Sequence, residues 1–152
     1  MLRKLKKEEK DKIIADINSQ YDASLELDGL LLSKDEKRES TKLFLYTGDR
    51  IPDVPAEWMG IHFCTIKEGM IIPSIEGAQY IGQTAKKVIG LSYEQARYIM
   101  SGRDIDIEED REKGYYILLT DEEVIGIGLA ENKKIINQTP KSRRTMQQYR
   151  TI

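Results

Sequence analysis

Apolar and polar residues follow different periods along this chain, and these periods predict where helices and strands lie. Residues 2–21 place apolar side chains, among them Leu5, Ile13 and Ile17, between lysines and glutamates, which predicts a surface helix with one buried stripe. Apolar runs at residues 25–33, 42–47 and 60–67 predict strands, with a loop at 48–55 that contains two prolines. This half of the chain is therefore expected to be α+β.

Two later segments have helix-start signals. Ser74 can cap a helix with Glu76 in its first turn, Ala78, Ile81 and Ala85 on its inner side, and Lys86 and Lys87 at its C-terminal end.

Ser92 and Gln95 have capping-box spacing at the start of the next predicted helix, and Gly102 should end it. Helical geometry places Ala96, Ile99 and Met100 on one side and Arg97 on another, where Arg97 is either solvated or in contact with a ligand.

A β-hairpin is predicted from two β-rich runs, residues 115–120 and 124–130, which flank a charged turn. Gly126 and Gly128 are two residues apart, so they lie on one face of the second strand. The missing side chains are expected to let another backbone approach closely.

Charge is strongly divided along the C-terminal part of the sequence although the whole chain carries only −2. Residues 101–123 contain three basic and nine acidic side chains, whereas residues 131–152 contain six basic and one acidic. An anion should therefore be attracted to the C-terminal segment and repelled by Asp104 to Glu112, which would orient a bound polyanion.

These features occur in an order that resembles a PUA domain, the RNA-binding module named after pseudouridine synthases and archaeosine transglycosylases. The order is LSYEQARYIMSG, an acidic loop, GYYILL, a charged turn, VIGIGLA and IINQTPKSRR, over about residues 86–144. The asparagine, proline and basic pair at its end are most similar to the C-terminal domains of Nol/Nop/Sun-type rRNA cytosine methyltransferases. They are also similar to standalone PUA proteins of pre-rRNA processing.

The resemblance implies an α+β fold with a small N-terminal pre-PUA α/β domain at residues 1–85 and a C-terminal PUA β-barrel-like domain at 86–152. Residues 72–82 are similar to the end of the pre-PUA domain in the same rRNA-associated proteins. The expected function is non-catalytic recognition of structured rRNA or tRNA during RNA modification or ribosome assembly. An RNA-modifying enzyme or a ribosome-assembly factor is the expected protein partner.

Basic and amide side chains are the candidate RNA-binding residues, because arginine and lysine neutralise phosphates and an amide can read sugars or base edges. They are Arg97, Lys133, Lys134, Asn137, Lys141, Arg143 and Arg144. Two alternatives stay open: a protein-docking adaptor in which the acidic loop binds a basic partner and the basic cluster is solvated, or an accessory subunit of a separate RNA methyltransferase.

No catalytic residue set or cofactor is expected. A Nol/Nop/Sun-type enzyme needs a cofactor-binding domain and two motif cysteines, but this chain has only Cys64 and no room for a Rossmann half. Gly126 and Gly128 lie within a predicted strand rather than at a strand-to-helix turn, so they do not indicate a dinucleotide site.

Three weaker features each have a structural and a functional interpretation. His62 and Cys64 could share a face and bind a metal, but a partly buried strand pair is the preferred interpretation. The carboxylates at 104–110 could bind a cation, although a solvated acidic loop is preferred. Trp58 and Met59 are either a hydrophobic anchor for a partner or part of the core.

The location expected from the sequence is cytoplasmic, without membrane association. No apolar run approaches the length of a membrane-spanning helix, and the lysine-rich start lacks the apolar centre of a signal peptide.

Overall fold

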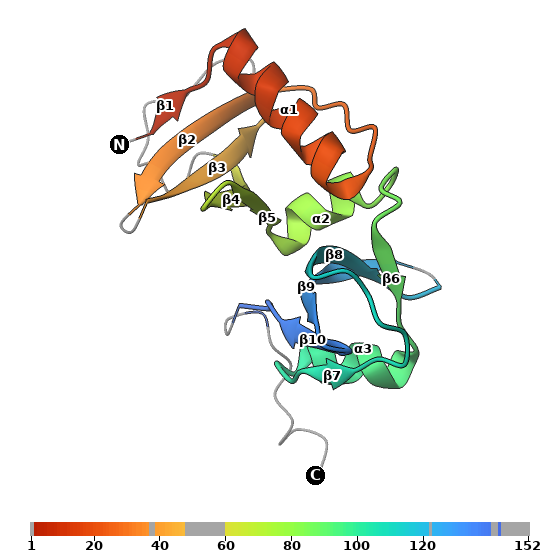
Figure 1. The fold of residues 1–152 in the computed structure, drawn as a ribbon. Coiled ribbons are helices and arrows are strands. Elements are labelled where there is room, and N and C mark those ends of the chain that lie inside the picture. The colour runs from red at the N-terminus through yellow and green to blue at the C-terminus, as the bar shows by residue number, and fades with distance from the viewer. Residues whose placement is uncertain (1, 37–38, 48–59, 122, 141–142, 144–152) are drawn as a thin grey trace. The chain divides into compact units, whose positions relative to one another are not determined.

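The chain divides into two units, Met1–Lys86 and Lys87–Ile152, in a computed structural model (Figure 1). The structure describes residues 2–36, 39–47, 60–121, 123–140 and 143. The predicted loop at 48–55 and the anchor candidates Trp58 and Met59 lie outside the described residues. Both units combine helices with a β-sheet, so the fold class is α+β.

In the first unit, the residues that the structure describes form an antiparallel sheet and two helices. Its strands are β1 (Arg3–Lys4), β2 (Leu30–Glu36), β3 (Ser40–Tyr46), β4 (Ile61–Lys67) and β5 (Met70–Pro73), in the order β1-β2-β3-β4-β5. Helix α1 (Lys7–Tyr21) lies along the sheet, and α2 (Ile75–Ile81) follows β5 (Figure 1).

The start of the first unit differs from the prediction of one helix over residues 2–21. Arg3 and Lys4 form an edge strand opposite Ser33 and Leu32, and the helix begins only at Lys7. The Glu9 carboxylate fixes this start, because it accepts the Lys6 N–H at 2.9 Å and two hydrogen bonds from the Arg3 guanidinium. The hydrogen bonds from Arg3 are the main cause that lowers the Glu9 pKa to about 2.

The last turn of α1 is joined to β5 by buried hydrogen bonds. Tyr21, which is fully buried, donates its hydroxyl to the Ile71 carbonyl at 2.5 Å. The Gln20 amide donates to the same carbonyl and accepts the Ile71 N–H. These bonds satisfy the polar groups of an edge strand beneath the helix.

The prediction for α2 is correct at its start and wrong at its end. Ser74 caps the helix by accepting the Gly77 N–H at 2.9 Å, and Ala78 and Ile81 are buried. The helix ends at Ile81, so Ala85, Lys86 and Lys87 lie beyond it. The predicted strand at 25–33 is also shifted, because pairing starts at Leu30, directly after Gly29 with its φ of +106°.

The described residues of the second unit form a mixed sheet and one helix. Its strands are β6 (Val88–Gly90), β7 (Ile105–Asp106), β8 (Gly114–Leu119), β9 (Val124–Glu131) and β10 (Lys134–Asn137), in the order β6-β8-β9-β10-β7. Only β6 and β8 are parallel among the described pairs. The predicted hairpin is confirmed as β8 and β9, and helix α3 (Tyr93–Met100) has the predicted Ser92–Gln95 capping box.

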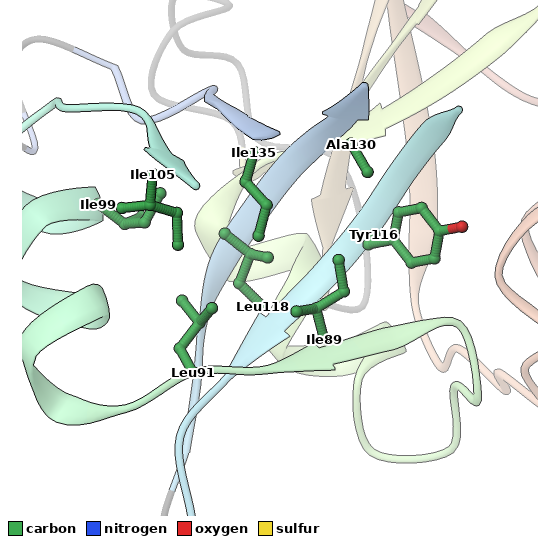
Figure 2. Packing of buried hydrophobic residues seen from close by; sticks show 8 residues of the cluster. All are labelled: Ile89, Leu91, Ile99, Ile105, Tyr116, Leu118, Ala130 and Ile135. Atoms are coloured by element: carbon green, nitrogen blue, oxygen red, sulfur yellow. The ribbon is translucent and has the colours of Figure 1, made fainter. Parts of the chain in front are cut away.

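Apolar side chains from α3, the strands β6 to β10 and Leu91, among them Tyr116, form the core of the second unit (Figure 2). Ile99 and Ile105 lie beside Ile135, and Leu118 lies between Leu91 and Ile135 (Figure 2). Met100 was predicted to share this buried side but is 44% exposed. Ala96 and Ile99 alone form the buried side of the two-turn helix.

Gly128 is required by this core for a reason that differs from the prediction. A Cβ atom at Gly128 would lie 2.3 Å from Ile135 Cγ2 and 3.0 Å from Leu118 Cδ1. The missing side chain therefore makes room for two neighbouring side chains rather than for a backbone.

Candidate nucleic-acid interface

Lys133 lies at the tip of a tight turn between β9 and β10. Asn132 and Lys133 both have left-handed backbones, with φ values of 52° and 59°. The strands close on the pair Glu131–Lys134, so the loop has the two left-handed residues of a type I′ hairpin. This turn was not predicted, although asparagine is a favoured residue at its first position.

Lys134 lies between two acidic residues. Its register partners are Glu131 on β9 and Asp106 on β7. Side chains directly opposite in an antiparallel pair lie about 5 Å apart at Cβ and on the same face. The charge of Lys134 is therefore partly offset by these two carboxylates, of which Glu131 also pairs with Lys113 at 3.3 Å.

This pairing corrects the predicted orientation of charge. The acidic loop supplies β7, and β7 is the direct neighbour of the basic strand β10. The Ile107 N–H also donates to the Lys133 carbonyl at 2.9 Å. Charge that is separated along the sequence is thus brought together in space, because β7 pairs with β10.

Asn137 joins the end of β10 to the end of α3. Its amide nitrogen donates to the carbonyls of Ile99 at 2.6 Å and Arg103 at 2.8 Å. Its amide oxygen accepts the Thr139 N–H at 2.7 Å, and its own backbone N–H donates to Asp104. Both amide hydrogens of Asn137 are used within the unit, where they hold two backbone carbonyls, and its predicted hydrogen bond to RNA sugars or base edges stays a prediction.

Aromatic and basic side chains form a surface on the exposed side of α3 and just after its C-terminal loop. We call it the α3 surface, and it consists of Tyr93, Arg97, Tyr98 and Arg103. Tyr93 is 61% exposed and Tyr98 is 38% exposed. The Arg103 guanidinium lies 5.5 Å from the centroid of the Tyr98 ring. Exposed aromatic rings beside arginines can stack on bases and attract phosphates.

Residues 86–145 match the family model described as the Methyltransferase RsmF PUA domain. The chain therefore contains a PUA domain. This domain resembles the C-terminal region of Sun-type methyltransferases. A comparison with curated proteins gives no match to the chain.

The PUA domain brings together some of the predicted RNA-binding residues. Arg97 is exposed in the last turn of α3, at the helix end where Asn137 is bound. Arg143 is also exposed, and its N–H donates to the Pro140 carbonyl. Lys133 and Lys134 lie at the opposite end of β10, about 10 Å from Asn137 at 3.3 Å per strand residue. Lys141 and Arg144 lie outside the described residues.

A second group of cations in the PUA domain was not predicted as a functional feature. The Lys87 ammonium lies 4.8 Å and the Arg111 guanidinium 5.9 Å from the centroid of the Tyr116 ring. Arg111 also lies within hydrogen-bond distance of the Val88 carbonyl and 3.4 Å from Glu109. These contacts hold the acidic loop beside β6.

His62 and Cys64, the pair considered for metal binding, have contacts typical of a packed strand. Cys64 is completely buried, and burial raises its thiol pKa to about 12, which opposes formation of the thiolate that a metal needs. The His62 Nε2 lies 3.1 Å from the Cys64 carbonyl and from the Thr65 hydroxyl. The His62 ring also packs against Phe44.

Within the described part of the chain, no helix has the length and apolarity needed to cross a bilayer.

Proposed function

We propose that this protein binds structured RNA, rRNA or tRNA, without catalysing a reaction on it. The observation that supports this proposal is the PUA match over residues 86–145, because RNA is the partner that a PUA domain indicates. The cellular setting we propose is RNA modification or ribosome assembly in the cytoplasm. The first unit would act as a pre-PUA domain that contributes to specificity or docking.

The α3 surface is the part of the PUA domain that we propose contacts RNA most directly. Tyr98 offers a partly exposed ring, and Arg103 lies close enough to the ring to hold it by a cation–π contact. Arg97 projects from the same helix and is exposed. A stem with flanking unpaired nucleotides could place phosphates on the arginines and an unpaired base on a tyrosine.

The lysines of the β9–β10 turn would add an electrostatic contribution. Lys133 is exposed at the tip of the turn, whereas Lys134 faces two acidic register partners. Lys133 should therefore attract phosphate more strongly than Lys134, since nearby carboxylates cancel part of the attraction.

The test is fluorescence anisotropy with labelled tRNA and rRNA fragments across a salt series. We expect the double variant Arg97→Ala, Arg103→Ala to weaken binding to all fragments and to reduce the salt slope by about 2, or about 1 for each phosphate that an arginine no longer neutralises. Tyr98→Ala should weaken binding by about 1–3 kcal/mol where a base stacks on the ring, while Tyr98→Phe keeps most of the affinity.

Lys113→Ala is the matched control, because Lys113 is an exposed cation of the same domain that already pairs with Glu131 at 3.3 Å. Absence of salt-sensitive RNA binding by the unaltered protein would refute the proposed function. Equal decreases in affinity for the control and the α3 variants would refute only the assignment of the site.

A further inference from the structure

The PUA domain contains an open cleft of about 470 Å³ that the proposed RNA contacts do not use. Its size lies within the range of pockets that hold small ligands or short peptide segments. One side is formed by β6 and the first turn of α3, and the other by the loop after β7. The lining residues are Ile89, Gly90, Gln95, Asp106, Ile107, Glu108, Glu109 and Arg111.

On the β6 side of the cleft, the outer edge of the strand is free at Gly90, whereas the Val88 carbonyl accepts from Arg111. In the parallel pair of β6 and β8, the Lys87 carbonyl and the Leu91 N–H bond to β8. Alternate residues of a strand bond to opposite sides, so the amide and carbonyl of Gly90 face away from β8. Among the described residues, neither group of Gly90 has a hydrogen-bond partner, and Gly90 itself is exposed.

The opposite side of the cleft has a second polar group that needs a partner. The Arg111 Nε atom is buried and is without a hydrogen-bond acceptor among the described residues, although its guanidinium contacts Val88 and Glu109. An unsatisfied buried donor is costly, so a small movement of this partly exposed side chain that brings Nε to an incoming carbonyl would be favoured. A peptide backbone supplies such carbonyls together with N–H groups.

The charge of the cleft indicates which kind of peptide segment it would bind. Asp106, Glu108 and Glu109 are exposed, and Arg111 is the single basic residue among those that line the cleft. This balance repels phosphates and attracts lysine or arginine. Ile89 and Ile107 add apolar surface for the stems of such side chains.

We propose that this cleft binds an extended, basic segment of a protein partner, which adds to the free edge of β6. The backbone of the segment would pair with Gly90 and place a carbonyl at Arg111 Nε, and its basic side chains would lie against Glu108 and Glu109. Peptides commonly bind a sheet edge in this way, with backbone bonds giving affinity and side-chain contacts giving specificity. The proposal does not depend on RNA binding by the α3 surface.

The probe for the test is a blocked pentapeptide of alternating basic residues and valines, KVRVK, added to the ¹⁵N-labelled full chain. The spectrum should show shifts of the Gly90 amide and the Arg111 Nε–H signal as the peptide is titrated. The acidic peptide EVEVE and an N-methylated KVRVK should leave both signals unmoved, because the first has the wrong charge and the second lacks strand-edge donors.

Two variants test the two sides of the cleft independently. Gly90→Leu should weaken peptide binding about tenfold or more, because the added side chain would occupy the cleft that Gly90 lines. The variant should still fold, since a Cβ atom at this position meets no atom within 4 Å. Glu108→Gln with Glu109→Gln should weaken it about three- to tenfold at low salt. Asp121→Asn with Glu123→Gln, which removes two exposed charges outside the cleft, should have no effect.

Both cleft variants should bind RNA as well as the unaltered chain, which separates this proposal from the proposed function. The docking proposal is overturned by absence of peptide binding to the unaltered chain, or if Gly90→Leu and the charge variant both bind the peptide as tightly as the unaltered chain does. It is also overturned if tRNA shifts the Gly90 and Arg111 signals and competes with the peptide, since the cleft would then belong to the RNA interface.

Discussion

The side-chain amide of Asn137 donates a hydrogen bond of 2.6 Å to the carbonyl of Ile99, 38 residues earlier in the chain. Ile99 is buried in the last turn of α3, and its carbonyl also accepts the Gly102 N–H at 3.0 Å. The same amide binds the Arg103 carbonyl. One side chain thus fixes the end of the helix, the loop after it and the end of β10.

Asn137→Ala should destabilise the PUA domain by about 1–3 kcal/mol, because it removes the side-chain hydrogen bonds to the Ile99 and Arg103 carbonyls and the one from the Thr139 N–H. Chemical denaturation followed by far-UV circular dichroism measures the change. Gln138→Ala is the matched control, since the Gln138 amide donates a longer bond, of 3.4 Å, to the Ile136 carbonyl. Equal stability of the two variants would show that Asn137 does not fix the helix end.

Gly128→Ala should destabilise the protein by about 1–3 kcal/mol through overpacking, because the new methyl group would collide with Ile135 and Leu118. Gly90→Ala adds the same group to another strand of the same sheet, where nothing lies within 4 Å. It should change stability by less than about 0.5 kcal/mol. Thermal unfolding of both variants tests whether Gly128 is required by the core. Equal melting temperatures would show that it is not.

Lys133→Gly should lower the salt slope of RNA binding by about 1 without reducing stability. Glycine adopts the positive φ of this turn position more easily than lysine, which offsets its greater freedom in the unfolded chain. Lys133→Val removes the same charge but places a β-branched residue at positive φ, so it should also destabilise the protein. Unchanged salt slopes in both variants would show that Lys133 does not contact phosphate.

The first unit should lose stability as pH falls below about 6.5, the ordinary pKa of histidine. Burial, reinforced by the charge of Lys42, lowers the pKa of His62 in the folded state. The unfolded chain therefore binds more protons between the two pKa values, and the free energy of unfolding decreases until the folded pKa is reached. Urea midpoints measured from slightly alkaline to mildly acidic pH should show this slope.

His62→Gln is the matched control for this effect, because glutamine keeps a polar group but does not titrate. The difference in pH dependence between the unaltered chain and His62→Gln isolates the effect of the histidine from that of the carboxylates, which titrate at lower pH. A parallel pH dependence in both chains would contradict the assignment.

The elements that were predicted well are those encoded by neighbouring residues. The Ser92–Gln95 capping box and the Ser74 cap were identified because their partners lie three residues apart. The hairpin of β8 and β9 followed from two apolar runs around a charged turn. Two helix limits were predicted wrongly, at residues 2–6 and after Ile81. At both places apolar or basic residues continue a helical pattern along the sequence, but tertiary contacts limit the helix to fewer residues.

Residue types and short spacings were enough to predict the helix caps, the hairpin and the order of motifs that indicates a PUA domain. The arrangement of charge could not be predicted in this way, because it depends on which strands pair. Pairing of β7 with β10 places Asp106 opposite Lys134, and it allows Asp104 to accept the Asn137 N–H. Strand pairing joins segments about 30 residues apart, and a charge pattern along the chain contains no information on that register.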